Sequence, residues 1–158
     1  MQDPLRWPKF YAATKHGDQK YGMLPYTHHL ADVESVLRRF NVTDEDMLTA
    51  AWLHDLVEDK GVKLKELVEM FNERVAELVG AVTNEKGENR KVRAALTYPK
   101  IRATKNAVCL KLADRIANVE HGGKLVEMYK KEYEDFRRAL YTSGEYEEMW
   151  THLDNLLK

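Results

Sequence analysis

The sequence predicts an all-α fold, a single compact helical bundle that occupies residues 1–158. Apolar residues recur mostly at helical spacing, and alternation with a period of two is scarce. No repeat, low-complexity tract or linker rich in proline and glycine divides the chain. With 158 residues, 44% of them hydrophobic and 32% charged, the chain is long enough for one core of ordinary size.

The first expected helix covers residues 5–15 and ends in the turn-rich segment that follows it. A helix over about 27–40 comes next and begins at a threonine. Thr43 and Asp46 have the spacing of an N-terminal capping pair, which predicts one continuous helix from there to about Lys60.

The second half of the chain continues the helical pattern. Two short helices over 64–71 and 72–83 precede a polar turn at 84–88. Pro99 is expected near a helix start, where proline is best tolerated. A strongly apolar helix over 101–120 ends at a His-Gly-Gly sequence. The helices expected to close the chain cover about 124–142 and 144–157.

Composition argues against several classes of protein. The formal net charge is −1, whereas a dedicated nucleic-acid binder is usually more basic. No stretch approaches membrane-spanning length, and the N-terminus has no apolar signal region. Cys109 is the single cysteine, which suits a reducing compartment. We therefore expect a cytoplasmic protein without nucleic-acid or membrane partners. No pattern indicates an oligomeric state.

Residues 50–59, AAWLHDLVED, place polar side chains on an otherwise apolar helix. On a continuous helix, His54 lies one turn from Glu58, and Asp55 lies one turn from Asp59. A buried edge with an imidazole and three carboxylates needs a cation or many hydrogen bonds. The alternative is a solvated helix face, because a His-Asp dipeptide alone is common by chance.

A polar stripe also marks the apolar segment AVCLKLADRIANV at 107–119. Lys111, Asp114, Arg115 and Asn118 are spaced i, i+3, i+4 and i+7, so they share one face of a helix that is otherwise apolar all round. A buried helix with one polar stripe is expected to line a site. The alternative is an internal ion pair of Asp114 with Lys111 or Arg115.

The adjacent residues His28 and His29 stand near a helix start in PYTHHL and point in different directions. One of them could join His54 and Asp55 as a ligand, although a histidine there is more often a capping or surface residue. Together the three segments offer imidazole and carboxylate donors without thiolate. Such a set suits a first-row divalent metal.

The order His, then His-Asp, then a later Asp resembles the signature of the HD phosphohydrolases. In closer detail the chain resembles the hydrolase domains of the Rel/SpoT stringent-response enzymes and the small alarmone hydrolases. The segments that carry this resemblance are HGDQKYGMLPYTHH (16–29), AAWLHDLVED (50–59), FNERVAELVGAVT (71–83) and KLADRIANV (111–119).

The resemblance implies an HD-domain fold and a metal-dependent (pyro)phosphohydrolase, with manganese (Mn²⁺) as the typical cofactor. The metal ligands that it implies are His29, His54, Asp55 and Asp114. Glu58 and Asp59 match the pair that handles the attacking water, and Asn118 matches a substrate contact. The implied substrate is a small-molecule guanosine nucleotide with a 3′-diphosphate (ppGpp), hydrolysed to GDP and pyrophosphate.

One segment departs from the family pattern. A basic pair usually follows the HxxQ element, but Lys20 and Tyr21 follow it here. Lys20 is expected to contact a phosphate and Tyr21 to stack on a base. An alternative is a related enzyme for another nucleotide, such as a 5′-nucleotide or NADPH. A second alternative is a non-catalytic nucleotide-binding module, against which the complete ligand set and the Glu58-Asp59 pair argue.

Overall fold

The computed structural model describes residues 2–158 and confirms the predicted all-α fold, to which it adds one small hairpin. Most expected helices are present, with ends shifted by a few residues. The elements are α1 (Arg6–His16), β1 (Lys20–Tyr21), β2 (Leu24–Pro25), α2 (Tyr26–Arg39), α3 (Glu45–Leu53), α4 (Leu56–Lys60), α5 (Leu64–Met70), α6 (Glu73–Val82), α7 (Arg90–Ala103), α8 (Ala107–His121), α9 (Val126–Leu140) and α10 (Glu147–Leu156).

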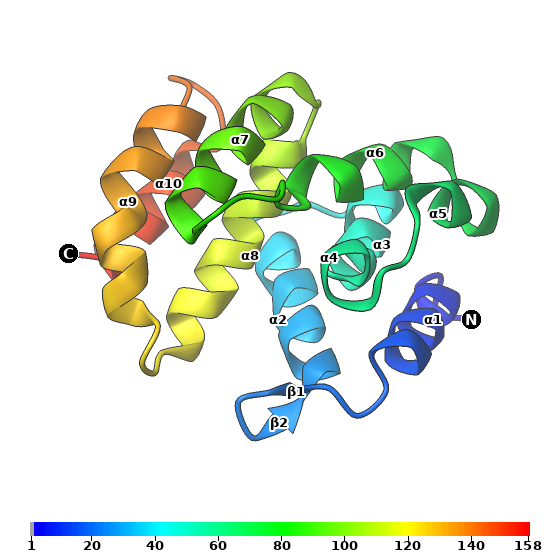
Figure 1. Ribbon diagram of the computed structural model, residues 1–158. Coiled ribbons are helices and arrows are strands. Elements are labelled where there is room, and N and C mark those ends of the chain that lie inside the picture. The colour runs from blue at the N-terminus through cyan, green and yellow to red at the C-terminus, as the bar shows by residue number, and fades with distance from the viewer. Residues whose placement is uncertain (1) are drawn as a thin grey trace.

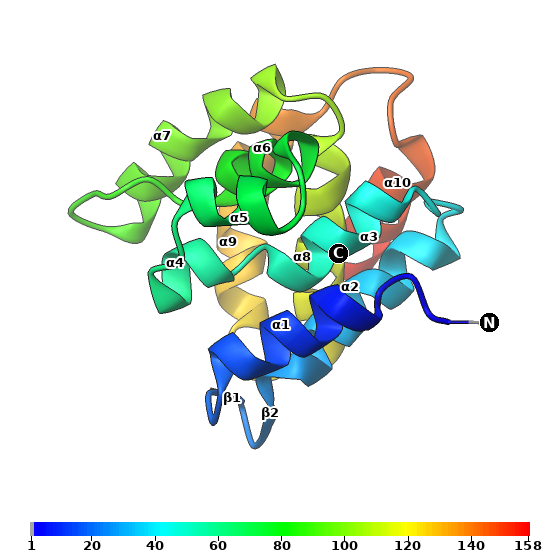
Figure 2. The same cartoon turned by 90° about the vertical axis from the view of Figure 1, so that its right-hand side faces the viewer.

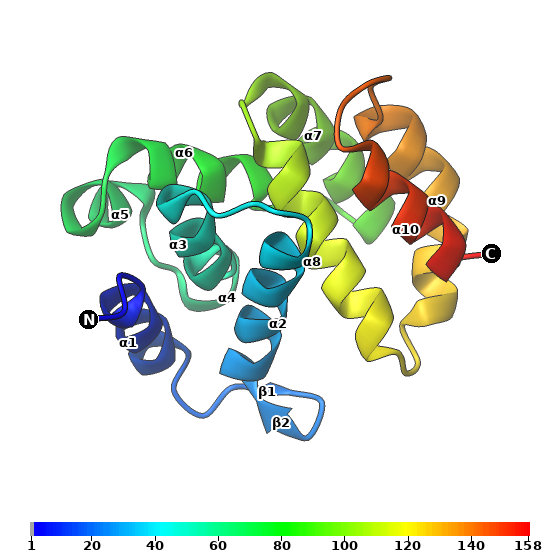
Figure 3. The same cartoon turned by 180° about the vertical axis from the view of Figure 1, so that it is seen from behind.

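Helices α2 and α8 pack against each other in the middle of the bundle (Figure 1). Helices α3 to α6 lie on one side of this pair, and α9 and α10 lie on the other, as the view from behind also shows (Figure 3). Helix α8 is buried along most of its length because its sequence is apolar on nearly every face. Helix α8 therefore contacts α3 and α6 on one side of the molecule and α9 and α10 on the other.

One hydrophobic core runs from α1 to α10. Its largest fully buried side chains include Trp150, Phe136 and Met47, which come from elements far apart in the sequence. Cys109 is buried in this core, and burial raises the pKa of its thiol to about 12, so it has no nucleophilic character near neutral pH. No helix within residues 2–158 is both long enough and apolar enough to cross a bilayer.

The prediction of one continuous helix from Thr43 to about Lys60 is wrong, because the helix breaks after Leu53 into α3 and α4. His54 is the C-cap of α3, and Asp55 is the N-cap of α4 with φ −98° and ψ −2°. On a continuous helix, neighbouring side chains point about 100° apart. The break instead turns these two side chains toward one point, with His54 Nε2 3.0 Å from Asp55 Oδ2.

The prediction that Thr43 and Asp46 form a capping pair at the start of α3 is also wrong. The N-cap residue of α3 is Asp44, and it makes no side-chain capping hydrogen bond. Asp46 has other partners: its carboxylate accepts hydrogen bonds from Asn72 Nδ2 at 2.9 Å and Arg74 Nη1 at 3.3 Å. A contact with the start of α6 has replaced the local cap.

Pro99 lies inside α7 rather than at a helix start. Proline removes one backbone hydrogen bond, to the carbonyl four residues earlier, which belongs to Ala95. Both residues are exposed, so solvent can satisfy that carbonyl. The apolar helix expected from residue 101 begins only at Ala107, because Asn106 has the left-handed conformation with φ +68°.

The segment expected to be only a turn forms the β1–β2 hairpin beside the start of α2 (Figure 2). Lys20 pairs with Pro25, and Tyr21 pairs with Leu24. The tight connection is possible because Gly22 adopts φ +62°, which glycine reaches without steric cost. The hairpin holds Tyr21 against the helix that follows it.

Candidate metal centre

Two imidazoles and two carboxylates converge in the middle of the bundle. His29 comes from α2, His54 and Asp55 from the break between α3 and α4, and Asp114 from α8. Ligand atoms of the first three residues all lie within 4.8 Å of one another. Asp114 Oδ1 is 3.0 Å from His29 Nε2 and 3.2 Å from His54 Nε2. The four predicted ligands therefore meet at one place.

The orientation of the two histidines leaves Nε2 as the atom that faces this cluster. His54 Nδ1 donates a hydrogen bond to the Ala51 carbonyl at 2.7 Å, which fixes the proton on that nitrogen. His29 Nδ1 is buried and has no hydrogen-bond partner among residues 2–158. Both side chains are almost completely buried, with 2% and 3% of their surface exposed.

The histidine and carboxylate side chains of the cluster change each other's pKa values. Burial opposes the charged form of His54, but Asp55 and Asp114 outweigh it and hold the pKa of His54 well above its usual value. Burial also disfavours the charged form of Asp114, but Lys111 and His54 outweigh it and hold the pKa of Asp114 well below its usual value. Burial likewise opposes the charged form of Asp55, but His54 lowers its pKa, so both carboxylates stay ionised in a buried place.

A first-row divalent cation fits these four residues. Imidazole nitrogen and carboxylate oxygen are donors that such cations accept. Donor atoms bound at about 2.0–2.2 Å in a tetrahedral shell lie roughly 3.3–3.6 Å apart. The observed separations between Nε2 and carboxylate oxygen atoms run from 3.0 to 3.6 Å. The spacing of the donors is therefore close to that of a metal shell.

Glu58 and Asp59 lie beside this cluster and line the same cavity, which has a volume of about 240 Å³. Each is held by one neighbour. Glu58 Oε1 accepts a hydrogen bond from the backbone N–H of Asn84 at 3.0 Å, and Gln19 Nε2 donates to Asp59 Oδ2 at 3.1 Å. Burial and the nearby charge of Asp55 raise the pKa of Asp59. The carboxylate of Asp59 is thus a stronger base than an ordinary one.

Positive side chains form another part of the cavity wall. Arg90, Lys111 and Arg115 line it, and all three also line an adjoining cavity of about 80 Å³. Lys111 Nζ is 3.4 Å from Asp114 Oδ2, so the ion pair weighed as an alternative to metal binding exists beside the cluster. The polar stripe of α8 therefore supplies both an anionic and a cationic part of the cavity.

Of the three predicted substrate-contacting residues, Tyr21 and Asn118 line the cavity and Lys20 does not. The Tyr21 ring stacks on His29 with centroids 4.7 Å apart, and the Tyr21 hydroxyl donates to Asn118 Oδ1 at 2.6 Å. Asn118 Nδ2 donates in turn to Asp114 Oδ1 at 3.3 Å. Lys20 is exposed on β1 and is not part of the cavity wall. Tyr21 and Asn118 are thus joined to the cluster, and Lys20 is not.

Sequence reasoning missed Tyr26, the first residue of α2. Its hydroxyl donates to Asp55 Oδ2 at 2.5 Å, and its ring stacks on buried His16 with centroids 4.5 Å apart. Burial and Asp55 raise the pKa of Tyr26 far above its usual value, so the hydroxyl keeps its proton and remains a donor. The available signal was its position three residues before His29, on the same helix face.

The C-terminal part of the chain, residues 122–158, packs against α8, the helix that carries Asp114. Arg115 is buried between the rings of Tyr129 and Phe136 of α9, with its guanidinium carbon 4.7 and 4.2 Å from their centroids. Its Nη2 is 3.6 Å from Glu132 Oε1. This packing connects the helix that carries Asp114 to α9.

Comparison with known proteins identifies the fold and its relatives. A model of a family described as "HD domain" matches residues 9–143. The solved structure of a metazoan ortholog of SpoT that hydrolyzes ppGpp superposes with a TM-score of 0.84 at 26% sequence identity. The superposition covers 99% of this chain and 94% of the other.

Two similar sequences carry the same enzyme name, guanosine-3′,5′-bis(diphosphate) 3′-pyrophosphohydrolase. The protein from Drosophila melanogaster, also named MESH1, is 33% identical over 114 residues, which are 69% of this chain and 64% of the fly protein. The protein from Aquifex aeolicus is 38% identical over 115 residues, which are 70% of this chain. The match spans only 16% of that longer protein.

Proposed function

This chain belongs to the HD domain family, and on that premise we propose that it is a metal-dependent phosphohydrolase. The proposed reaction is the hydrolysis of guanosine 3′,5′-bis(diphosphate) to GDP and pyrophosphate, the activity for which its fly and Aquifex relatives are named. The observation that carries the proposal is the convergence of two imidazoles and two carboxylates next to Glu58 and Asp59 in one cavity.

The metal centre in this proposal has four ligands and holds Mn²⁺. The proposed ligands are His29, His54, Asp55 and Asp114. When bound, such a cation lowers the pKa of a water molecule and offsets charge on phosphoryl oxygens. The Ala51 carbonyl and the Tyr26 hydroxyl orient two of these ligands, His54 and Asp55, by hydrogen bonds. Partners of this kind hold ligands in place and tune their basicity.

Glu58 and Asp59 are the proposed proton acceptors for the attacking water. The water oxygen bonds to the 3′ phosphorus, and the bond between that phosphorus and the ribose 3′ oxygen breaks. The water proton passes to Glu58 or Asp59, and the 3′ oxygen takes up a proton as pyrophosphate leaves. Positioned general bases contribute about 10²–10⁴-fold to such reactions. The raised pKa of Asp59 makes its carboxylate a stronger base than an ordinary one, which suits this role.

The remaining cavity residues would bind the nucleotide. Arg90 and Lys111 offer positive charge to the phosphates. Asn118 and Tyr21 are the proposed contacts to the nucleoside, and Lys20 a more distant phosphate contact. We also propose that residues 1–158 form one domain, which acts in the cytoplasm in a stringent-type response. A single buried cysteine suits that compartment.

One observation favours a second candidate, a related HD enzyme for another nucleotide. The hydroxyl of Tyr21 donates a hydrogen bond to Asn118 Oδ1, which is then not free to accept one from a nucleotide. In addition, Lys20 and Tyr21 stand where the family usually has a basic pair. A pocket altered in this way could prefer a 5′-nucleotide or NADPH. The two candidates differ in product, because the first releases pyrophosphate and the second releases orthophosphate.

The test is incubation of the purified protein with Mn²⁺ and a panel of ppGpp, 5′-nucleotides and NADPH, with products separated by chromatography. We expect GDP and pyrophosphate from ppGpp. The His54→Ala variant, purified in the same way, is the control for contaminating hydrolases. Release of orthophosphate alone would support the second candidate, and intact nucleotides throughout would contradict both.

A further inference from the structure

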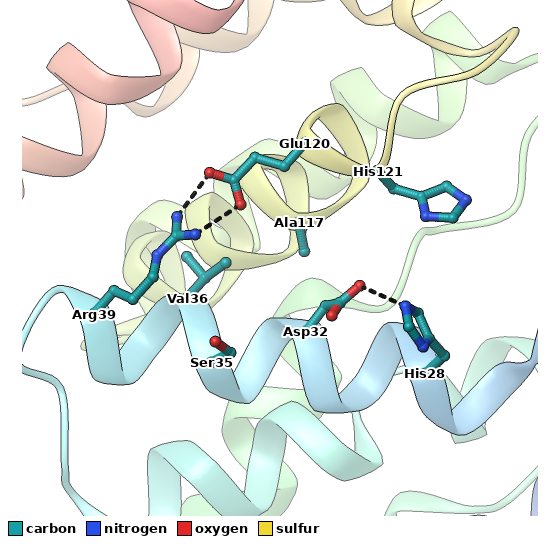
Figure 4. A pocket seen from close by; sticks show the side chains of 8 residues that line it. All are labelled: His28, Asp32, Ser35, Val36, Arg39, Ala117, Glu120 and His121. Atoms are coloured by element: carbon teal, nitrogen blue, oxygen red, sulfur yellow. Dashed lines mark hydrogen bonds and ion pairs between the residues drawn. The ribbon is translucent and has the colours of Figure 1, made fainter.

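A second cluster of metal-ligating side chains lies on the outer faces of α2 and α8. It consists of His28 and Asp32 on α2 and His121 at the last position of α8, and we call it the outer cluster (Figure 4). One ligand atom from each residue lies within 4.8 Å of the other two. We propose that the outer cluster binds a divalent transition-metal cation, best represented by Zn²⁺.

The backbone brings the three donors together. His28 and Asp32 are one helical turn apart, and His28 Nε2 is 3.5 Å from Asp32 Oδ2. Figure 4 shows the His121 ring projecting from the end of α8 above this pair. Gly122 and Gly123, both with positive φ, turn the chain away directly after His121. The histidine is therefore left at the mouth of the pocket rather than covered by the chain that follows.

The charge around the outer cluster favours a cation. Asp32 and Glu120 are the acidic residues of the surrounding cavity, which has a volume of about 380 Å³, and Arg39 is its basic residue. Arg39 is held by Glu120 through two hydrogen bonds of 2.7 and 3.0 Å at the far end of the cavity. Arg39 therefore pairs with Glu120 rather than with Asp32. His121 also stands at the negative end of the α8 dipole.

The donor set selects the kind of cation. Two imidazoles and one carboxylate, without further carboxylates, suit Zn²⁺ better than Mg²⁺ or Ca²⁺. Zinc bonds of about 2.0–2.2 Å put donor atoms roughly 3.3–3.6 Å apart, so a closure of at most about 1.2–1.5 Å from the 4.8 Å limit is enough. The side chains of His28 and Asp32 are 47% and 40% exposed, which leaves them room to rotate. The simpler alternative is an ion pair of His28 with Asp32, in which His121 has no part.

The experiment measures binding of Zn²⁺ alone to the whole chain by titration calorimetry and by metal analysis after dialysis. We expect two equivalents for the unaltered protein and one for His121→Ala or Asp32→Asn, with the weaker equivalent lost. His152→Ala is the matched control, because His152 is a partly exposed histidine that contacts Glu120 of the cavity but is not one of the three proposed donors. This control should keep both equivalents.

A second pair of variants separates the outer cluster from the buried centre. His54→Ala should keep one equivalent of Zn²⁺, and His54→Ala combined with His121→Ala should keep none. The His121→Ala and Asp32→Asn substitutions lie at the surface, and circular dichroism would verify their folding. Uptake of a single equivalent by the unaltered protein, or equal Zn²⁺ affinity with and without His121, would overturn the proposal.

Discussion

The buried centre and the outer cluster both take imidazole and carboxylate groups from α2 and α8, and the centre adds His54 and Asp55 from the break between α3 and α4, but the two differ in burial. The neighbours His28 and His29 illustrate this, because their side chains are 47% and 2% exposed. In the outer cluster, water can solvate an unpaired carboxylate. In the centre, Asp55 and Asp114 have little water, so their charges must be neutralised within the protein. Burial thus decides which cluster requires its cation.

The largest expected effect comes from removing one carboxylate from each cluster. Asp114→Ala should abolish tight metal binding at the centre and lower kcat by at least about 10³-fold, because several kcal/mol of transition-state stabilisation are lost. Asp32→Ala, in the outer cluster, should leave kcat within about twofold. Steady-state kinetics and metal analysis of both purified variants measure this contrast. Equal losses in the two variants would show that burial does not separate the clusters.

The next effect concerns proton transfer rather than metal binding. Glu58→Gln should keep the metal of the centre and lower kcat by about 10²–10⁴-fold, because the amide cannot accept the proton of the water. The hydrogen bond from the Asn84 backbone can still be accepted by the amide oxygen, so the side chain stays in place. Kinetics with parallel metal analysis gives the answer. Loss of metal as well would make Glu58 a ligand.

Chelation should affect stability more through the centre than through the outer cluster. Removal of a cation present at about 100 times its Kd costs about 2.7 kcal/mol of unfolding free energy. For a chain of this size we expect Tm to fall by about 5–10 °C. Differential scanning calorimetry with and without EDTA measures it. The variant with both His28→Ala and His121→Ala should show nearly the same fall, and its absence there would reverse the comparison.

The smallest effect is expected at Tyr21, which touches both regions. Its ring contacts His29 and also His121, with centroids 4.7 and 4.6 Å apart. Tyr21→Phe keeps these ring contacts but loses the hydrogen bond to Asn118, worth about 0.5–1.5 kcal/mol. We expect KM to rise about threefold to tenfold with kcat unchanged. A lower KM would mean that the hydroxyl competes with substrate instead of positioning Asn118.

Much of this architecture follows from sequence periodicity. The single polar stripe on an apolar helix predicted where Asp114 and Asn118 would face, because a fully buried helix leaves no other place for them. The family resemblance identified the member of the His28–His29 pair that points inward. The fold class followed from the same helical spacing, and the structure confirms it.

Other features depend on contacts that no local pattern encodes. The break after Leu53 falls in a segment without proline or glycine, so the local sequence does not predict it. A side-chain bond from His54 to the Ala51 carbonyl and one from Tyr26 to Asp55 accompany the break, and the second joins residues 29 positions apart. The outer cluster likewise needed the packing of α2 on α8, which brings His121 to His28.

The β1–β2 hairpin lines the cavity beside the centre but takes no part in the hydrophobic core. Its tip is in solvent, with Met23 96% exposed, and neither strand contributes a residue to the hydrophobic core. Of its four strand residues, Tyr21 alone lines the cavity beside the centre. Changes in length or sequence at the tip of this ribbon would therefore leave the bundle core untouched, whereas a change at Tyr21 would reach His29 and Asn118.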